Sequence, residues 1–249
     1  MYIAQIIWPG TWLDLPDTEV VSEVGGMLRS LEDRVAEAAI ALTMFESVSL
    51  SREDPGAEWE RDAAIRTEVD DLLKQEVGEL YYCDFDKYRL ESERRVLKRR
   101  SELGLVPRSY FHKIPFIHAH TFIYAVDSFG KFLDELCEYE LLPSVLEEIR
   151  DAFNAQLPMV RMIRNSALHV EDRSRFYGSS SDKKKGKKMQ VDGFLGLSNL
   201  EGNLLCYTII DGSYQKVAIS PETLGVLVET TNNILRVLPW KGPASISPK

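Results

Sequence analysis

The sequence predicts a mainly helical protein with a small antiparallel β-meander inserted before its last helix. Two patterns point to this fold class. Apolar residues recur at helical spacing over most of the chain, whereas short β-branched and aromatic runs between turn residues are confined to 191–219. Hydrophobic residues make up 44% of the 249 residues, which is enough for a substantial core, so we expect one domain over 1–249.

The first third of the chain is expected to form long helices. Between residues 24 and 45, apolar residues alternate in steps of four and three, the spacing of a coiled-coil seam. Pro55-Gly56 separates this helix from a second helical stretch over 58–103, which we expect to break near 84–88. The seam residues are Val24, Leu28, Leu31, Val35, Ala38, Leu42 and Phe45. The buried stripe of the second stretch is expected at Ile65, Val69, Leu72, Leu73, Val77 and Leu80.

A basic cluster lies near the end of the second stretch. It consists of Arg94, Arg95, Lys98, Arg99 and Arg100. Because glutamates alternate with these cations, we interpret the cluster as a solvated helix face rather than a nucleic-acid surface.

Two more helical segments follow. Residues 118–139 carry a large apolar face, and Pro143 opens a fourth segment that Pro158 is expected to kink. His118 and His120 are two residues apart and would point about 200° apart on a helix, with no carboxylate at ligand spacing. We therefore predict no metal ligands here.

The C-terminal region changes character. Residues 174–190 are rich in Gly, Ser and Lys, which predicts a flexible basic loop. Strands are expected at 194–197, 204–210 and 214–219, with turns at Glu201-Gly202-Asn203 and Asp211-Gly212, forming a β insertion over 191–219. Ser220-Pro221 then starts the last helix, and 239–249 is expected to be a loose tail.

The most informative feature is the segment Arg164-Asn165-Ser166-Ala167-Leu168-His169, which we call the motif segment. On a helix, Arg161, Arg164, Asn165 and His169 share a polar face, whereas Met159, Met162, Ile163, Ala167 and Val170 occupy the opposite arc. Asn165 and His169 are four residues apart and could touch, which would orient the imidazole. Arg164 and His169 lie about 140° apart. They meet at one phosphate only if the helix ends or bends between them, or if a second copy contributes the missing half.

The motif segment resembles the signature of the HEPN family, in which Arg is followed by a polar residue, a short spacer and His late in a helix. Arg164, Asn165 and His169 match it. The resemblance implies an up-and-down helical bundle that dimerises through the motif helices. It also implies metal-independent RNA cleavage without a cofactor, often in toxin–antitoxin or antiphage systems. One subgroup carries a modifiable Tyr two residues after the His, where this chain has Glu171, so neutralisation by that modification is not expected.

The catalytic residues are accordingly expected to be Arg164, Asn165 and His169, with no metal. An imidazole such as that of His169 can act as a general acid or base, and Arg164 could stabilise charge on phosphorus. RNA-binding residues are expected at Arg161 and in the basic loop, at Lys183, Lys184, Lys185, Lys187 and Lys188. Alanine at Arg164 or His169 is expected to leave the thermal midpoint unchanged, since neither residue has an apolar environment in the sequence pattern.

Other interpretations stay open. Arg164 and His169 could be surface residues paired locally with Glu171 or Asp172, and the lysine-rich loop could be merely solvated. The chain could also be a HEPN-like module that binds RNA or nucleotide without cutting it. A third alternative is a helical partner in a toxin–antitoxin or defence complex that acts through its heptad seam.

The charge distribution and the cysteine content indicate which ligands and which cellular compartment to expect. The net charge is −9, but residues 1–92 hold 8 basic and 21 acidic residues, leaving 22 basic and 18 acidic residues in 93–249. The half with the motif segment is therefore mildly basic. Three scattered cysteines without a C-x-x-C pair predict neither disulfides nor zinc, which fits a cytoplasmic protein. The apolar N-terminus lacks the basic region of a signal peptide, and no membrane association is expected.

Overall fold

The structure, a computed structural model, describes residues 1–50 and 54–248 and is mainly helical, as predicted. The contacts divide the chain into two compact units rather than the single domain expected from composition. Unit 1 comprises Met1–Glu46 and Phe116–Lys249, and unit 2 comprises Ser47–Pro115. No helix among the described residues combines the length and apolar character needed to cross a bilayer.

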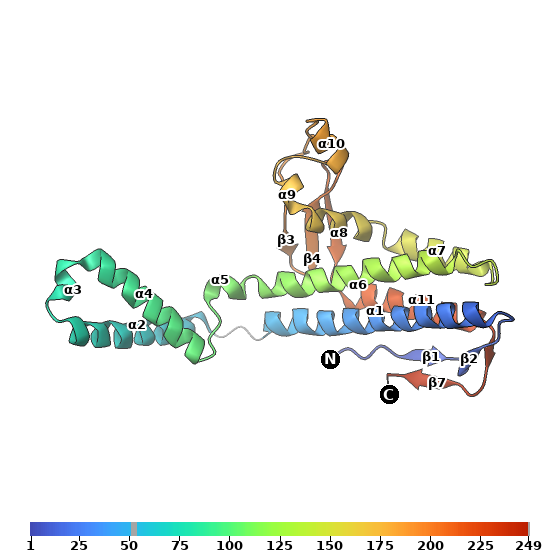
Figure 1. Cartoon of the computed structure of the whole chain (residues 1–249), viewed down its shortest axis with the longest axis horizontal. Coiled ribbons are helices and arrows are strands. Elements are labelled where there is room, and N and C mark those ends of the chain that lie inside the picture. The colour runs from blue at the N-terminus through green and yellow to red at the C-terminus, as the bar shows by residue number, and fades with distance from the viewer. Residues whose placement is uncertain (51–53, 249) are drawn as a thin grey trace. The chain divides into compact units, whose positions relative to one another are not determined.

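Unit 1 is built around the N-terminal helix α1 (Thr18–Leu50) and α6 (Ile114–Leu136), which are drawn with roughly aligned axes in Figure 1. All seven residues of the heptad seam are at most 5% exposed and lie in the same core as Phe122, Phe129 and Leu133 of α6. The helical prediction for the seam is confirmed. Because the seam is buried in the core of its own chain, it is not available as a binding surface for a partner.

The two ends of the chain are tied together in unit 1. Strand β1 (Ile6–Trp8) pairs antiparallel with β7 (Ser245–Ser247), and β2 (Trp12–Leu13) pairs with β6 (Trp240–Lys241). The rings of Trp8 and Trp240 meet edge to face at 5.5 Å. The expected loose tail over 239–249 is therefore wrong: its strands are only two and three residues long, too short to give a recognisable alternation.

The β-meander forms where the sequence placed it, with one shift. Strands β3 (Asn199–Glu201), β4 (Leu204–Thr208) and β5 (Tyr214–Ala218) are antiparallel in the order β3-β4-β5. The first strand lies at 199–201 instead of 194–197. Gly202 and Gly212 adopt φ of 64° and 89°, values that favour glycine, in the two predicted turns. Helix α11 (Pro221–Val237) follows, with the Ser220 hydroxyl accepting from the Thr223 N–H.

The elements that carry the motif segment lie against α6 and the meander. Helix α7 (Val145–Gln156) ends before Pro158, and α8 (Val160–Leu168) begins after it. Pro158 therefore separates two helices instead of kinking one, because it cannot continue the hydrogen-bond ladder. Helix α8 packs against β4 and β5, and the short helices α9 (Val170–Arg173) and α10 (Ser180–Lys184) follow it.

Unit 2 contains a helical hairpin of α2 (Pro55–Val77) and α4 (Phe85–Glu102), with the short α3 (Leu80–Cys83) between them and α5 (Arg108–Phe111) after them. Its core is small, with Ile65, Val69 and Val96 in contact. Leu72 and Leu80, expected to be buried, are 50% and 60% exposed. The helical break occurs at Gly78 and Asp84, so only the start of the expected 84–88 break is correct.

Every cation of the basic cluster in α4 has a carboxylate partner. Arg95, Arg99 and Arg100 reach across to Glu76, Glu68 and Asp62 of α2, while Arg94 pairs with Glu91 and Lys98 with Glu102 within α4. Pairs of this kind on a helical surface each contribute little to stability. Arg94 and Lys98, 80% and 79% exposed, fit the predicted solvated helix face. Arg95, Arg99 and Arg100 instead join α4 to α2, so the prediction of a solvated face holds for only part of the cluster.

Candidate functional site

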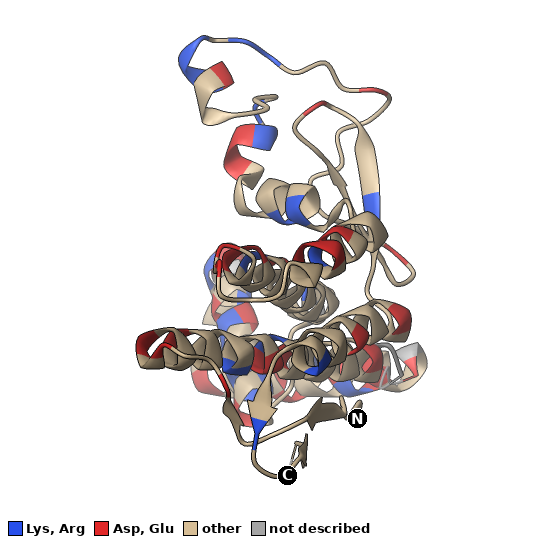
Figure 2. Ribbon diagram, turned by 90° about the vertical axis from the view of Figure 1, so that its right-hand side faces the viewer, with Lys and Arg blue, Asp and Glu red and all other residues tan. Residues whose placement is uncertain are grey.

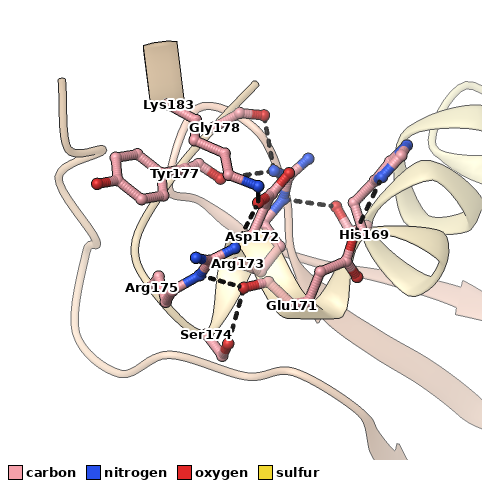
Figure 3. Close-up of polar contacts among 10 residues, drawn as sticks. His169, Glu171, Asp172, Arg173, Ser174, Arg175, Tyr177, Gly178 and Lys183 are labelled. Atoms are coloured by element: carbon pink, nitrogen blue, oxygen red, sulfur yellow. Dashed lines mark hydrogen bonds and ion pairs between the residues drawn. The ribbon is translucent and has the colours of Figure 1, made fainter. Parts of the chain in front are cut away.

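The motif segment is divided by the end of a helix. Helix α8 stops at Leu168, and His169 leaves helical geometry with φ −115° and ψ 40° while its N–H donates to the Asn165 carbonyl at 3.1 Å. The His169 side chain is 53% exposed, and its Nδ1 lies 3.8 Å from Glu171 Oε1 (Figure 3). The helix therefore ends between Arg164 and His169, which was one of the two arrangements left open by the helical wheel. Its end places the His169 ring near Glu171 of α9.

Arg164 faces in a different direction, towards α6. Its Nε donates to Asp127 Oδ2 at 2.7 Å, and its Nη2 contacts the same oxygen. Its Nη1 donates to Asn165 Oδ1 at 2.8 Å. Asn165 thus orients the guanidinium, and in the described part of the chain no side-chain hydrogen bond joins Asn165 to His169. The expected contact between the amide and the imidazole is replaced by one between the amide and the arginine.

Asp127 belongs to the site although no sequence pattern singled it out. Its side chain is 2% exposed, and Lys131 Nζ lies 3.0 Å from Oδ2 while Arg161 Nε lies 3.5 Å from Oδ1. The Oδ1 atom is buried without a hydrogen-bond donor among the described residues. The sequence did offer one signal: Asp127 is an acidic residue among the apolar residues of α6. A buried carboxylate is normally paired with a cation, so its position pointed to a cationic partner.

Arg161 links this buried carboxylate to a second one. Its Nη2 donates to Asp134 Oδ2 at 2.9 Å, and that hydrogen bond raises the pKa of Arg161. The Arg161 side chain is 52% exposed, as is that of Lys131. We call Asp127, Lys131, Asp134, Arg161 and Arg164 the ion-pair cluster.

Arg173, which the sequence also did not single out, fixes the chain after the motif segment. It is 4% exposed, and its Nη1 donates to the carbonyls of Tyr177 and Gly178 at 2.7 and 2.6 Å (Figure 3). Its Nε donates to the Ser166 hydroxyl of α8 at 3.4 Å. Burial lowers the pKa of Arg173. A buried guanidinium with carbonyl acceptors therefore anchors the start of the basic loop against α8.

The basic loop is more ordered than its composition predicted. The Ser179 hydroxyl caps α10, and Lys183 Nζ lies 2.7 Å from Asp172 Oδ1, an interaction that lowers the pKa of Asp172. Lys188 Nζ lies 3.8 Å from the centre of the Tyr177 ring and donates to the Arg175 carbonyl.

The other three lysines of the loop are available. Lys184, Lys185 and Lys187 have no ion pair or side-chain hydrogen bond with any described residue. Figure 2 shows the basic residues of α10 and the following chain at the outer end of this region. Two of the five predicted RNA-binding lysines thus anchor the loop, and the other three make no such contact with the described residues.

Within residues 1–50 and 54–248, one group of side chains could hold a cation, although the sequence predicted no metal ligands. The ligand atoms of His169, Glu171 and Asp172 all lie within 4.8 Å of one another. An imidazole and two carboxylates suit a divalent transition metal. However, Asp172 already pairs with Lys183 and Arg175, so a metal ion would have to displace two cations.

Comparison with protein-family models, with curated proteins and with solved structures gives no match for this chain. Its function is therefore inferred from its own residues and their geometry.

Proposed function

We propose that the protein is a metal-independent endoribonuclease of HEPN type, in which the 2′-hydroxyl of the RNA attacks the adjacent phosphorus. The observation that carries this proposal is the end of α8 between Arg164 and His169. It leaves a half-exposed imidazole directly after a helix whose arginine is held in place, next to a loop with three available lysines. These are the groups that phosphodiester cleavage without a metal requires.

Each residue has a role in this mechanism. His169 transfers protons to and from the reacting oxygens, a contribution worth roughly 10² to 10⁴ in rate. Arg164 stabilises the negative charge that develops on the phosphorane, and Asn165 holds the guanidinium in position through its 2.8 Å hydrogen bond. Arg161 is an outer phosphate contact, and the loop lysines hold the RNA backbone.

The proposed active unit is a homodimer through the motif helices. Arg164 faces α6 and His169 faces α9, so the two groups of one copy point to different sides. A two-fold axis that joins the ends of two α8 helices would bring His169 of one copy to Arg164 of the other. Leu168, 49% exposed, would be buried at that interface. Following the family resemblance, we further propose a role as a toxin or antiphage component that acts with an antitoxin or defence partner.

The alternative is a HEPN-like module that binds RNA or nucleotide without cutting it. One observation favours it: the Arg164 guanidinium is already engaged by Asp127 and Asn165, and its side chain is only 14% exposed. An arginine so constrained could position a phosphate-binding helix without reaching the phosphate. Cleavage assays separate this alternative from the main proposal.

The test is cleavage of single-stranded RNA by the full chain and its variants. His169→Ala and Arg164→Lys should abolish or strongly reduce cleavage, while the matched control His112→Ala, at an exposed histidine of unit 2, should cut like the wild type. A substrate with 2′-deoxyribose at the cut site should resist because it lacks the nucleophile. Wild-type activity in His169→Ala would refute the nuclease. RNA binding without any wild-type cleavage would establish the alternative.

A further inference from the structure

A hollow of about 520 Å³ opens beside the ion-pair cluster, between α6, α7 and α8. Its walls are mostly apolar, with Leu157, Pro158 and Met162 at the junction of α7 and α8 and Phe153 from α7. The polar groups in its lining come from Asn154, Asn165, Arg161 and Asp127. Apolar walls with a few polar groups are the common composition of a small-molecule site.

The sequence creates this hollow locally. Pro158 ends one helix and forces a new start at Val160, which opens the corner between α7 and α8. On the facing side, Gly130 of α6 has no side chain, and a Cβ there would lie 3.1 Å from Phe153 Cε1. The Phe153 ring is held against Phe129 with 5.2 Å between centroids. Met162, expected on the core side, is instead 43% exposed at the rim.

The hollow shares two residues with a neighbouring polar one. Arg161 and Asn165 also line a space of about 250 Å³, together with Lys131, Arg164, Asp134 and Glu135. Arg161 thus borders both an apolar space and a space lined by cations. These two spaces match the base and the phosphate of a nucleotide. The planar guanidinium suits a phosphate on one side and a flat ring on the other.

We infer that this hollow binds the base of a ribonucleotide whose phosphate contacts Arg161. The identity of the ligand as RNA rests on the proposed function. The base contacts Met162, Leu157 and Pro158 on its faces, and the amides of Asn154 and Asn165 meet its polar edge. Contacts of this kind are tolerant of sequence when they depend on the ring face.

The charges near Arg161 determine how such a nucleotide binds. Three cations, Lys131, Arg161 and Arg164, are balanced by Asp127, Asp134 and Glu135. The phosphate therefore replaces Asp134 at Arg161 rather than being drawn by an excess of positive charge. Binding at this site depends mainly on the base and changes little with salt, in contrast to binding by the loop lysines.

The test measures equilibrium binding of adenosine 5′-monophosphate and of ribose 5-phosphate, which lacks the base, to the full chain. The wild type should bind the nucleotide roughly tenfold more tightly, because the apolar faces of the base leave water when they contact the hollow. Met162→Trp, from α8, and Asn154→Trp, from α7, each fill the hollow and should bring the two affinities together. The matched control Met44→Trp, at a methionine of α1 that is 45% exposed against 43% for Met162, should keep the preference.

Equal wild-type affinities for the two compounds would overturn the inference, as would a preference that survives in both filled variants. The outcome is separable from that of the proposed nuclease. His169→Ala should keep the nucleotide preference while losing cleavage. Cleavage retained in His169→Ala would reject the nuclease and leave the base site standing, whereas normal cleavage data without a nucleotide preference would reject the base site alone.

Discussion

Arg164 of α8 is joined to Asp127 of α6 by a hydrogen bond of 2.7 Å from Nε to Oδ2, across 37 residues of sequence. The carboxylate is 2% exposed, so this pair connects the motif segment to the interior of unit 1. It also changes what we expect of substitutions at Arg164, which the sequence pattern alone suggested would not affect folding.

Arg164→Ala should destabilise the protein because it removes the main partner of a buried carboxylate. Breaking a buried pair costs roughly 3–5 kcal/mol, and since Lys131 and Arg161 still contact Asp127, we expect about 2 kcal/mol. The double variant Arg164→Ala/Asp127→Asn should regain part of the lost free energy of unfolding, because it no longer buries an unpaired carboxylate. Urea unfolding measures the difference between the two variants. An unchanged unfolding midpoint in Arg164→Ala would show that Asp127 does not depend on it.

The dimer prediction is tested at Leu168, which is 49% exposed at the end of α8. Leu168→Lys places a charge in the proposed interface, so it should shift the protein to monomer in analytical ultracentrifugation and reduce cleavage. Leu141→Lys, at a leucine of unit 1 with the same 49% exposure, is the control and should leave assembly unchanged. A wild type that is monomeric at micromolar concentration would contradict the interface.

The loop lysines divide into two groups with different expected effects. Replacing Lys184, Lys185 and Lys187 with Gln should leave folding intact and weaken RNA binding. The slope of log affinity against log salt should fall by up to about 0.7 for each phosphate that the variant no longer neutralises. Replacing Lys183 and Lys188 should also loosen the loop, because these two hold Asp172 and the Arg175 carbonyl. Limited proteolysis would detect that loosening as faster cleavage of the loop. If the triple and the double variant were cut equally fast, the loop lysines would not fall into these two groups.

Removal of divalent metal should leave cleavage unchanged. His169, Glu171 and Asp172 could hold a metal ion, so a metal-dependent mechanism is a concrete alternative that this experiment tests. Activity should persist in EDTA and in Glu171→Gln, and the products should end in 2′,3′-cyclic phosphate. A metal-dependent mechanism would replace the proposed one if EDTA abolished cleavage, a divalent ion restored it, and the Glu171→Gln variant were inactive.

His120 should make the protein sensitive to mild acid. Its Nε2 lies 2.6 Å from the hydroxyl of the buried Tyr207, and burial lowers the pKa of His120 below its usual 6.5. Because the unfolded chain then binds the proton more readily, the stabilising contribution is complete above pH 6.5 and is lost as the pH falls towards the folded-state pKa. His120→Gln should flatten the pH dependence of the unfolding free energy in this range. An unaltered pH profile would exclude His120 as the cause.

The sequence by itself determined the features that depend on neighbouring residues. The heptad seam of α1, the Ser220 cap of α11 and the turns at Gly202 and Gly212 all follow from spacing, capping or backbone freedom within a few positions. The sequence also located the interruption at Pro158, although it predicted a kink where the structure has two helices. The end of α8 between Arg164 and His169 was one of the arrangements that the helical wheel allowed.

Only the tertiary structure decided which groups these elements bring together. The Arg164 partner on α6, the burial of Arg173 and the contact from Trp8 Nε1 to Ser247 Oγ, 239 residues away, arise from packing between distant segments. Such contacts are set by how apolar surfaces fit together, which no local pattern encodes. For the same reason the hollow beside Arg161 could not be read from the sequence, since it requires Gly130, Phe153 and Met162 to meet from three helices.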